Sequence, residues 1–136
     1  MSASSGATPN LLAAHPVFLV DDIVKSAEWY RDVLGFTFDR YWGEPPCFCM
    51  VAREDVEIFL SGPEEPGQKI MRPNRSHTAA WDVYIRVRNL EELHQEFKAK
   101  GAKIVRAPDD TFYEMREFEV EDINGYARCF GMDISK

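Results

Sequence analysis

The chain has 136 residues, 45% of them apolar, which is enough for one domain with its own core and too short for two independent enzyme domains. Sixteen Lys and Arg against 23 Asp and Glu give a net charge of −7, which disfavours electrostatic binding to phosphate backbones or anionic membranes. We therefore expect neither a nucleic-acid partner nor a membrane partner.

The cysteines and the N-terminal segment bear on the compartment. The three cysteines, Cys47, Cys49 and Cys129, are odd in number and form no CxxC pair, which argues against a disulfide scaffold or a structural zinc site. Residues 1–13 hold no basic leader, and the apolar stretch that follows is too short to cross a bilayer. We expect a flexible N-terminal tail and a cytoplasmic protein with free thiols.

A strand and a helix open the folded part of the chain. Residues 14–20 are a short apolar run rich in β-formers, which predicts a strand. Ser26 is a candidate N-cap for the helix that follows, and Gly35 suits the left-handed residue that ends it. Short connections then favour antiparallel neighbours among three further predicted strands, at 36–42, 48–53 and 56–61.

A polar segment separates this half from a second, similar one. Residues 62–80 are rich in prolines, glycines and charges, which predicts a linker or a flap. After it come a predicted strand at 81–87 and a helix that Asn89 can cap and that leads to Gly101. The remaining pattern predicts strands at 104–106, 116–121 and 126–131, the last two joined by a turn.

The order of elements repeats along the chain. Both halves read as strand, helix and three strands, and His15 and Asp82 occupy equivalent places in the two opening strands. We therefore predict an α+β fold, in which two βαβββ modules, residues 14–61 and 81–136, form a curved mixed sheet around a cleft within one structural domain. Such a cleft is a natural place for a small molecule.

Two segments carry more specific patterns. His15 to Phe36 contains a Ser-x-x-aromatic-Tyr motif followed by Leu-Gly-Phe, and Met115 to Gly131 contains Arg-Glu-Phe, an Asp-Ile-Asn-Gly turn and a Phe-Gly ending. These patterns resemble the vicinal oxygen chelate superfamily of glyoxalases, extradiol dioxygenases and fosfomycin and bleomycin resistance proteins. The Phe-Gly ending is most similar to bleomycin-resistance-like members. The resemblance covers residues 14–132 and implies paired βαβββ modules and a homodimer.

The resemblance also implies where a metal ion would be held. In metal-dependent members the ligands come from the first and last strands of each module, and the matching positions here are His15, Phe59, Asp82 and Cys129. Phe59 has no donor atom, and a thiolate at Cys129 would favour softer ions than Mg²⁺ or Mn²⁺. We therefore favour a site without metal. The alternative is a divalent ion held by His15, Glu57 and Asp82.

Each of these side chains also has a simpler interpretation. His15 can be a cleft histidine that makes one hydrogen bond. Asp82 and Glu57 can either contact a cationic ligand or be neutralised within the sheet by Arg128 or Arg116. The sequence leaves these alternatives open.

Aromatic residues make up 12% of the chain, and the resemblance places several of them at the cleft and its rim. Flat rings near carboxylates suit a planar cationic ligand, although the same residues can line an ordinary apolar pocket. The candidate ligand-binding residues are His15, Phe38, Trp42, Phe48, Glu57, Phe59, Asp82, Tyr84, Tyr113, Arg116 and Cys129.

Two functions follow from these features. The first is a small-molecule-binding protein without metal, which sequesters an aromatic or cationic ligand, such as a bleomycin-type antibiotic, in a dimer cleft. The second is a divalent-metal-dependent lyase, isomerase or dioxygenase of the same superfamily, for which no catalytic residue can be assigned. Nothing in the sequence favours a third hypothesis, a regulatory or assembly partner without a ligand.

Overall fold

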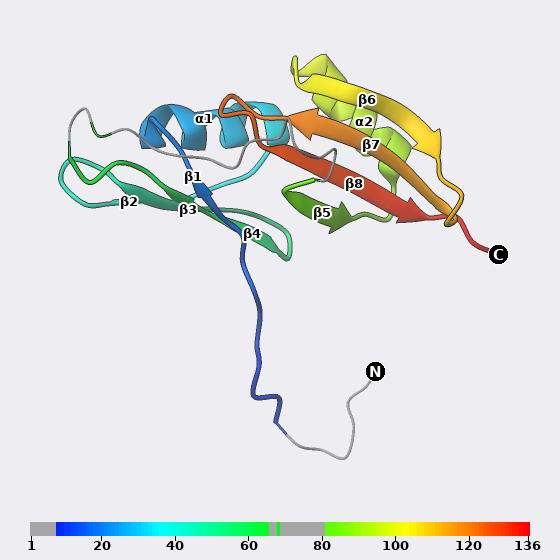
Figure 1. Ribbon diagram of the computed structural model, residues 1–136, viewed down its shortest axis with the longest axis horizontal. Coiled ribbons are helices and arrows are strands. Elements are labelled where there is room, and N and C mark those ends of the chain that lie inside the picture. The colour runs from blue at the N-terminus through cyan, green and yellow to red at the C-terminus, as the bar shows by residue number, and fades with distance from the viewer. Residues whose placement is uncertain (1–7, 66–67, 69–80) are drawn as a thin grey trace.

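The computed structural model describes residues 8–65, 68 and 81–136, and these residues form two helices and eight strands in two four-stranded mixed sheets (Figure 1). This confirms the predicted α+β class. Most of the predicted linker, 62–80, and the first seven residues of the predicted tail lie outside the described residues. No helix in the described part of the chain is long and apolar enough to cross a membrane.

The first module contains one helix and four strands. Its strands lie in the order β1-β4-β3-β2, with β1 parallel to β4 and the other pairs antiparallel. The predicted strand 36–42 is shorter than expected, because only its last two residues and a bridge between Thr37 and Ala52 join the sheet. The elements are β1 (Val17–Leu19), α1 (Ile23–Leu34), β2 (Tyr41–Trp42), β3 (Phe48–Arg53) and β4 (Val56–Ser61).

The second module repeats this arrangement with the strand order β5-β8-β7-β6. Strand β6 runs further than the predicted 104–106, and it includes Pro108. It tolerates the proline because it is an edge strand whose pairing to β7 shifts register on the way. The elements are β5 (Val83–Arg86), α2 (Leu90–Ala99), β6 (Lys103–Asp110), β7 (Met115–Glu121) and β8 (Ala127–Asp133).

The start of α1 differs from the prediction. Asp22 is the N-cap, and its carboxylate accepts a hydrogen bond from the backbone N–H of Lys25 at 3.0 Å. Ser26 instead lies buried within the helix, and its hydroxyl oxygen accepts a hydrogen bond from the Asn124 side chain at 3.0 Å. Sequence pattern alone does not distinguish the two residues, because Asp and Ser cap equally well. Gly35 ends the helix at φ 73°, as predicted.

Each helix covers one face of its own sheet and leaves the other face open (Figure 1). The alternation along β4 shows this division, since Ile58 and Leu60 are fully buried whereas Glu57 and Phe59 are only half-buried. In the second module, Phe97 of α2 packs on Phe118 and Phe130 of the sheet, with ring centroids 6.2 and 5.3 Å away. The open faces are where side chains remain available to a ligand.

A buried ion pair of the second module, extended by a hydrogen bond to Tyr30, joins it to the first module. Arg128 on β8 is fully buried and donates hydrogen bonds to the Asp122 carboxylate at 2.6 Å and to the Tyr30 hydroxyl of α1. Close by, the rings of Phe18 and Tyr126 stack with centroids 4.4 Å apart. Arg128 is therefore committed to the junction and does not neutralise Asp82 or Glu57 in the sheet.

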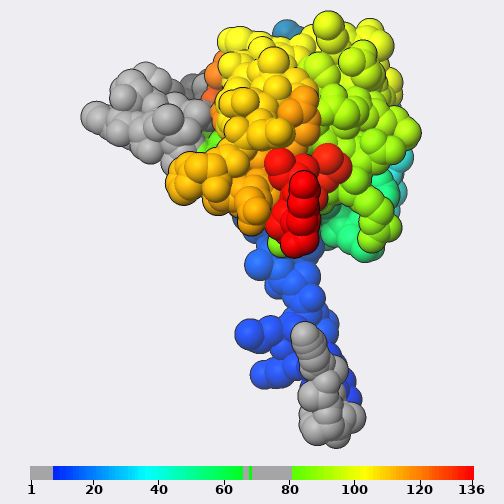
Figure 2. Space-filling model, turned by 90° about the vertical axis from the view of Figure 1, so that its right-hand side faces the viewer, coloured from blue at the N-terminus to red at the C-terminus, as the bar shows by residue number. Residues whose placement is uncertain are grey.

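Most of the chain before β1 lies apart from the two modules. It projects from the body of the molecule (Figure 2), and Leu11 and Leu12 there are 91% and 87% exposed. Next to β1 the chain contacts the first sheet, because the Pro16 carbonyl accepts a hydrogen bond from the backbone N–H of Phe59 at 3.0 Å and the His15 ring stacks on the Phe59 ring.

Candidate functional site

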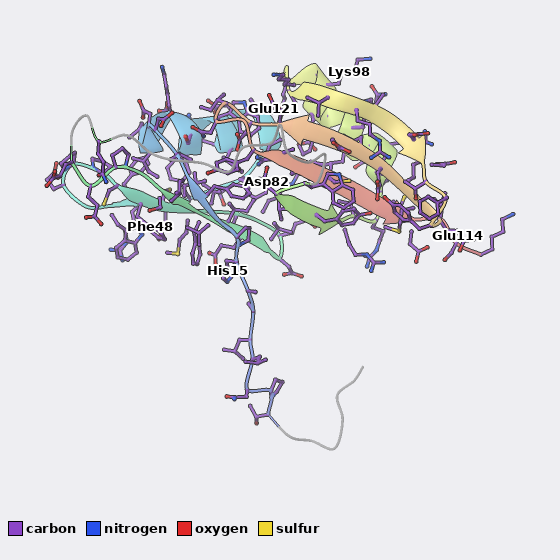
Figure 3. The ribbon with its side chains drawn as sticks, in the orientation of Figure 1. His15, Phe48, Asp82, Lys98, Glu114 and Glu121 are labelled. Carbon is purple, nitrogen blue, oxygen red and sulfur yellow. The ribbon has the colours of Figure 1, made fainter. Side chains whose placement is uncertain are left out.

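The open face of the first sheet is apolar and aromatic. Residues of neighbouring strands meet there in register, with Phe59 opposite both Val17 and Met50. The rings of Phe48 and Phe59 lie edge to face with centroids 5.6 Å apart. Figure 3 shows the side chains of His15 and Phe48 on the side of this sheet that faces away from α1.

His15 stacks on this aromatic surface. Its ring lies 4.7 Å from the Phe59 ring, centroid to centroid, and Nδ1 donates a hydrogen bond to the backbone carbonyl of Glu57 at 3.1 Å. A carbonyl oxygen only accepts, so Nδ1 carries the proton. The Glu57 carboxylate is 3.6 Å from Nε2, beyond hydrogen-bonding distance. This arrangement corresponds to the cleft histidine described above.

The implied metal positions do not form a set of donors. Phe59 has no donor atom, and Oδ2 of Asp82 accepts a hydrogen bond from the backbone N–H of Ala127 at 2.8 Å. Cys129 is fully buried, and burial, together with the nearby carboxylates, raises the pKa of its thiol to about 12, so it is protonated at neutral pH. Within the described part of one chain, no three His, Cys, Asp or Glu side chains are placed to hold an ion.

The open face of the second sheet has a different character, because a buried carboxylate lies at its centre. Glu117 on β7 is fully buried and accepts hydrogen bonds from the hydroxyl of Tyr84 at 2.7 Å and from that of Tyr113 at 2.9 Å. Arg106 on β6 donates to the same carboxylate at 3.1 Å. Three strands and the β6–β7 turn therefore converge on one side chain.

These contacts keep Glu117 charged. Burial acts to raise the pKa of Glu117, but the hydrogen bonds from Tyr84 and Tyr113 and the ion pair with Arg106 outweigh it, so the pKa lies below its usual value. The pKa of Tyr84 is raised by burial and by its bond to Glu117, which leaves its hydroxyl protonated as a donor.

A second carboxylate and an indole extend this cluster. Glu119 accepts hydrogen bonds from Arg106 at 2.8 Å and from the indole N–H of Trp81 at 3.0 Å. The rings of Trp81 and Tyr84 lie 4.9 Å apart, centroid to centroid. We call Trp81, Tyr84, Arg106, Tyr113, Glu117 and Glu119 the Glu117 cluster.

A glycine within β8, Gly131, makes room for Tyr84. A Cβ atom added to Gly131 would lie 1.9 Å from the Tyr84 hydroxyl oxygen and 2.4 Å from the ring carbon that bears it. The Phe-Gly ending noted in the sequence therefore has a local role, since it lets the Tyr84 ring lie against β8 with its hydroxyl at Glu117.

The structure divides the candidate ligand-binding residues among three places. Two lie away from the open faces: Phe38 packs against the core beside Tyr41, and Arg116 pairs with Glu91 of α2 and with Asp110 at 2.8 Å. Arg116 therefore does not neutralise Asp82 or Glu57. The first open face holds His15, Trp42, Phe48, Glu57 and Phe59, and the second module holds Asp82, Tyr84, Tyr113 and Cys129.

Sequence reasoning missed Glu117, Glu119 and Arg106. The alternation of charged and apolar residues from Glu117 to Glu121 shows that these glutamates share one face of a strand. It does not show that this face is covered by Tyr84 and Tyr113, which come from other parts of the chain. That cover turns a solvated strand face into a buried cluster.

The family follows from a sequence comparison. The sequence model of the glyoxalase/bleomycin resistance protein/dioxygenase superfamily matches residues 12–134. The chain belongs to this superfamily. No curated protein matches the sequence significantly.

Solved structures of other proteins share the fold. TioX from Micromonospora sp. ML1 has a TM-score of 0.68 and 20% identity over 88% of this chain and 98% of its own. TnmS3, an antibiotic binding protein from Streptomyces sp. CB03234, has a TM-score of 0.65 and 17% identity over 90% and 97%. A glyoxalase-related enzyme from Clostridium phytofermentans has a TM-score of 0.69 and 15% identity over 93% and 100%. At these identities the likeness shows the fold alone.

Proposed function

We propose that this superfamily member is a small-molecule-binding protein that works without a metal ion and sequesters a planar aromatic cation at its open sheet faces. The observation that carries this proposal is the ionised Glu117 carboxylate among aromatic side chains. Glu117 and Glu119 share one cation, Arg106, so within the described part of the chain the Glu117 cluster carries one more negative than positive charge. A cationic group on a flat ring suits such a surface through charge attraction and cation–π contact.

The first open face supplies the aromatic surface for the same ligand. Phe48, Phe59 and Trp42 lie on it, and β1 at its edge exposes 55% of Val17 and 38% of Leu19. Exposed apolar side chains on an edge strand need a cover. We propose that a second copy of the chain provides it, so that the two open faces of different protomers enclose the ligand. TnmS3, described as an antibiotic binding protein, is an example of this fold with a small-molecule ligand.

The donor chemistry supports a site without metal. The two positions that would complete a ligand set with His15 and Asp82 are a phenylalanine and a protonated, buried thiol. Elemental analysis of protein re-exposed to Mn²⁺, Fe²⁺, Ni²⁺ and Zn²⁺ tests this point. About one ion per chain, lost in His15→Ala, would overturn it and favour the metal-dependent lyase, isomerase or dioxygenase.

Ligand titration tests the binding itself. We expect acriflavine, a planar aromatic cation, to bind and to raise the melting temperature, and acridone, a neutral ring system of similar size, to bind at least tenfold more weakly. Glu117→Gln should weaken acriflavine binding by about tenfold or more, because it removes the central charge. Glu121→Gln is the matched control, because Glu121 also lies on β7 but pairs with Lys103 outside the Glu117 cluster. Equal binding of both dyes, or equal effects of both variants, would refute the proposal.

A further inference from the structure

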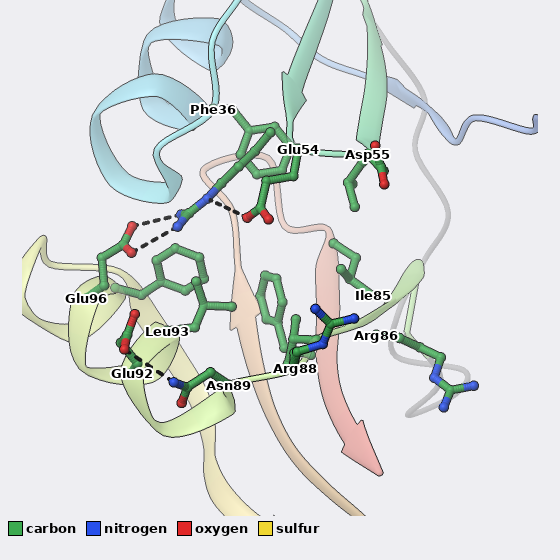
Figure 4. Close-up of a pocket in the computed structure, with 15 residues that line it drawn as sticks. Phe36, Glu54, Asp55, Ile85, Arg86, Arg88, Asn89, Glu92, Leu93 and Glu96 are labelled. Atoms are coloured by element: carbon green, nitrogen blue, oxygen red, sulfur yellow. Dashed lines mark hydrogen bonds and ion pairs between the residues drawn. The ribbon is translucent and has the colours of Figure 1, made fainter.

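A cavity of about 530 Å³ lies between the two modules (Figure 4). The β3–β4 turn forms one wall, and the end of β5, the β5–α2 connection and α2 form the others. None of the candidate residues of the open faces lines it. Its volume falls within the range of roughly 300–1,000 Å³ that is typical of small-molecule pockets.

The cavity lies on the opposite side of the second sheet from the Glu117 cluster. Ile85 and Phe130 line it, whereas their strand neighbours Tyr84 and Cys129 belong to the other face. Leu93 and Phe97 of α2 continue this apolar lining. This apolar lining therefore suits an aromatic ring or another apolar group of a ligand.

Among the residues that the structure describes, one arginine at the cavity has no hydrogen-bond or ion-pair partner. Arg53 is held by two hydrogen bonds to Glu96 at 2.8 and 3.0 Å and by a third to the Leu34 carbonyl at 2.8 Å. Arg86 points away from the cavity, and Asp133 is its nearest carboxylate at 3.9 Å. Arg88 makes no ion pair or side-chain hydrogen bond within the part of the chain that the structure describes, and its guanidinium lies beside Ile85 (Figure 4).

The distribution of charge around the cavity orients a ligand. Glu54 and Asp55 occupy the β3–β4 turn, across the cavity from Arg88 (Figure 4). An anionic group is repelled at the turn and attracted at Arg88. Two further carboxylates line the cavity, but each is already bonded: Glu96 to Arg53 at 2.8 Å, and Glu92 to the Asn89 side chain at 3.3 Å.

We propose that this cavity is a second ligand site, which binds a small aromatic carboxylic acid with its carboxylate on Arg88 and its ring against Leu93 and Phe97. The guanidinium fork matches a carboxylate in geometry as well as charge. The site shares no residue with the open faces. An experiment that disproves this site therefore leaves the function proposed above untouched, and the reverse also holds.

Binding of 3-phenylpropionate to the full-length protein tests this site, with the neutral 3-phenylpropionamide as the matched ligand control. Calorimetry measures the affinity, and backbone amide shifts locate the site. We expect the acid to shift signals of residues 85–97 and to bind at least tenfold more tightly than the amide. Arg88→Gln should weaken binding of the acid by roughly tenfold to a hundredfold, the usual range for a charged hydrogen bond. Arg88 is exposed, so this variant retains the fold.

The control variant is Arg31→Gln, which removes an exposed arginine of α1 that does not line the cavity. It should bind the acid as the wild type does. The proposal is overturned by equal affinities for acid and amide, by an unchanged affinity in Arg88→Gln, or by shifts confined to the open faces. It is also overturned if the backbone amide shifts of residues 85–89 change when the protein concentration is raised but not when the acid is added. In that case a second copy of the chain fills the cavity.

Discussion

Tyr84 lies so close to Gly131 that a single Cβ atom on the glycine would come within 1.9 Å of the Tyr84 hydroxyl oxygen. The same hydroxyl donates the 2.7 Å hydrogen bond to Glu117. A backbone position in β8 thus determines the geometry of a hydrogen bond between β5 and β7.

The first prediction follows from this contact. Gly131→Ala should displace the Tyr84 ring and break its bond to Glu117, so it should weaken acriflavine binding as much as Tyr84→Phe does. Both variants should lower the free energy of unfolding, Tyr84→Phe by about 1 kcal/mol for the lost hydrogen bond. The double variant should add little to either, because both changes remove the same interaction. Additive effects on affinity in a double-mutant cycle would show that the contact does not position Tyr84.

The second prediction concerns how the contribution of Glu117 to the free energy of unfolding changes with pH. Because its folded-state pKa lies below the usual value, Glu117 stabilises the protein above its unfolded pKa and loses this contribution as the pH falls through the folded pKa. Glu117→Gln should therefore cost about 1–3 kcal/mol at pH 7 and less at pH 3.5. Urea unfolding at the two pH values measures the difference. A cost that is the same at both would contradict the ionised state assigned to Glu117.

The third prediction tests the junction between the modules. Arg128→Ala leaves Asp122 buried without its counter-ion, and removal of one partner of a buried pair costs about 3–5 kcal/mol. Chemical denaturation should show a much lower midpoint or no folded protein. Arg31→Ala removes an arginine from an exposed pair with Asp32 and should leave the midpoint near that of the wild type. Similar midpoints for the two variants would mean that the junction does not stabilise the fold.

The fourth prediction concerns the reactivity of the three cysteines toward a thiol reagent. Burial raises the pKa of Cys49 to about 11 and that of Cys129 to about 12, and both side chains are fully buried, whereas Cys47 is partly exposed. A thiol reagent at pH 8 should therefore modify Cys47 alone in the native protein and all three cysteines after denaturation. Cys47→Ser should abolish the fast reaction. Fast modification that persists in this variant would show that a buried thiol is reachable.

Much of the fold is predictable because its signals are local. The strands 48–53 and 56–61 are short, mostly apolar runs separated by a polar turn, and Gly35 carries the left-handed conformation expected at a helix end. The cap of α1 was not predictable, because Ser26 is drawn into a contact with Asn124 of the other module. Contacts between distant segments leave no periodic trace in a sequence.

The candidate site was predictable only where single residues define it. The family resemblance places His15, Phe48 and Phe59 at the cleft, and in the structure they share an open sheet face. Glu117 was missed, since its burial depends on Tyr113 in a turn and on Tyr84 in another strand. Arg116 was assigned to the site, but its strand position turns it toward Glu91 of α2.

Calorimetric titration of acriflavine into chelator-treated protein and into protein reloaded with Mn²⁺ or Zn²⁺ tests the central claim most directly. Because the proposed ligand is attracted by the charge of the Glu117 cluster and packs on the aromatic faces, we predict the same affinity in all samples and no stoichiometric ion in the protein. Binding that appears only after reloading, with about one ion per chain, would contradict a metal-free site.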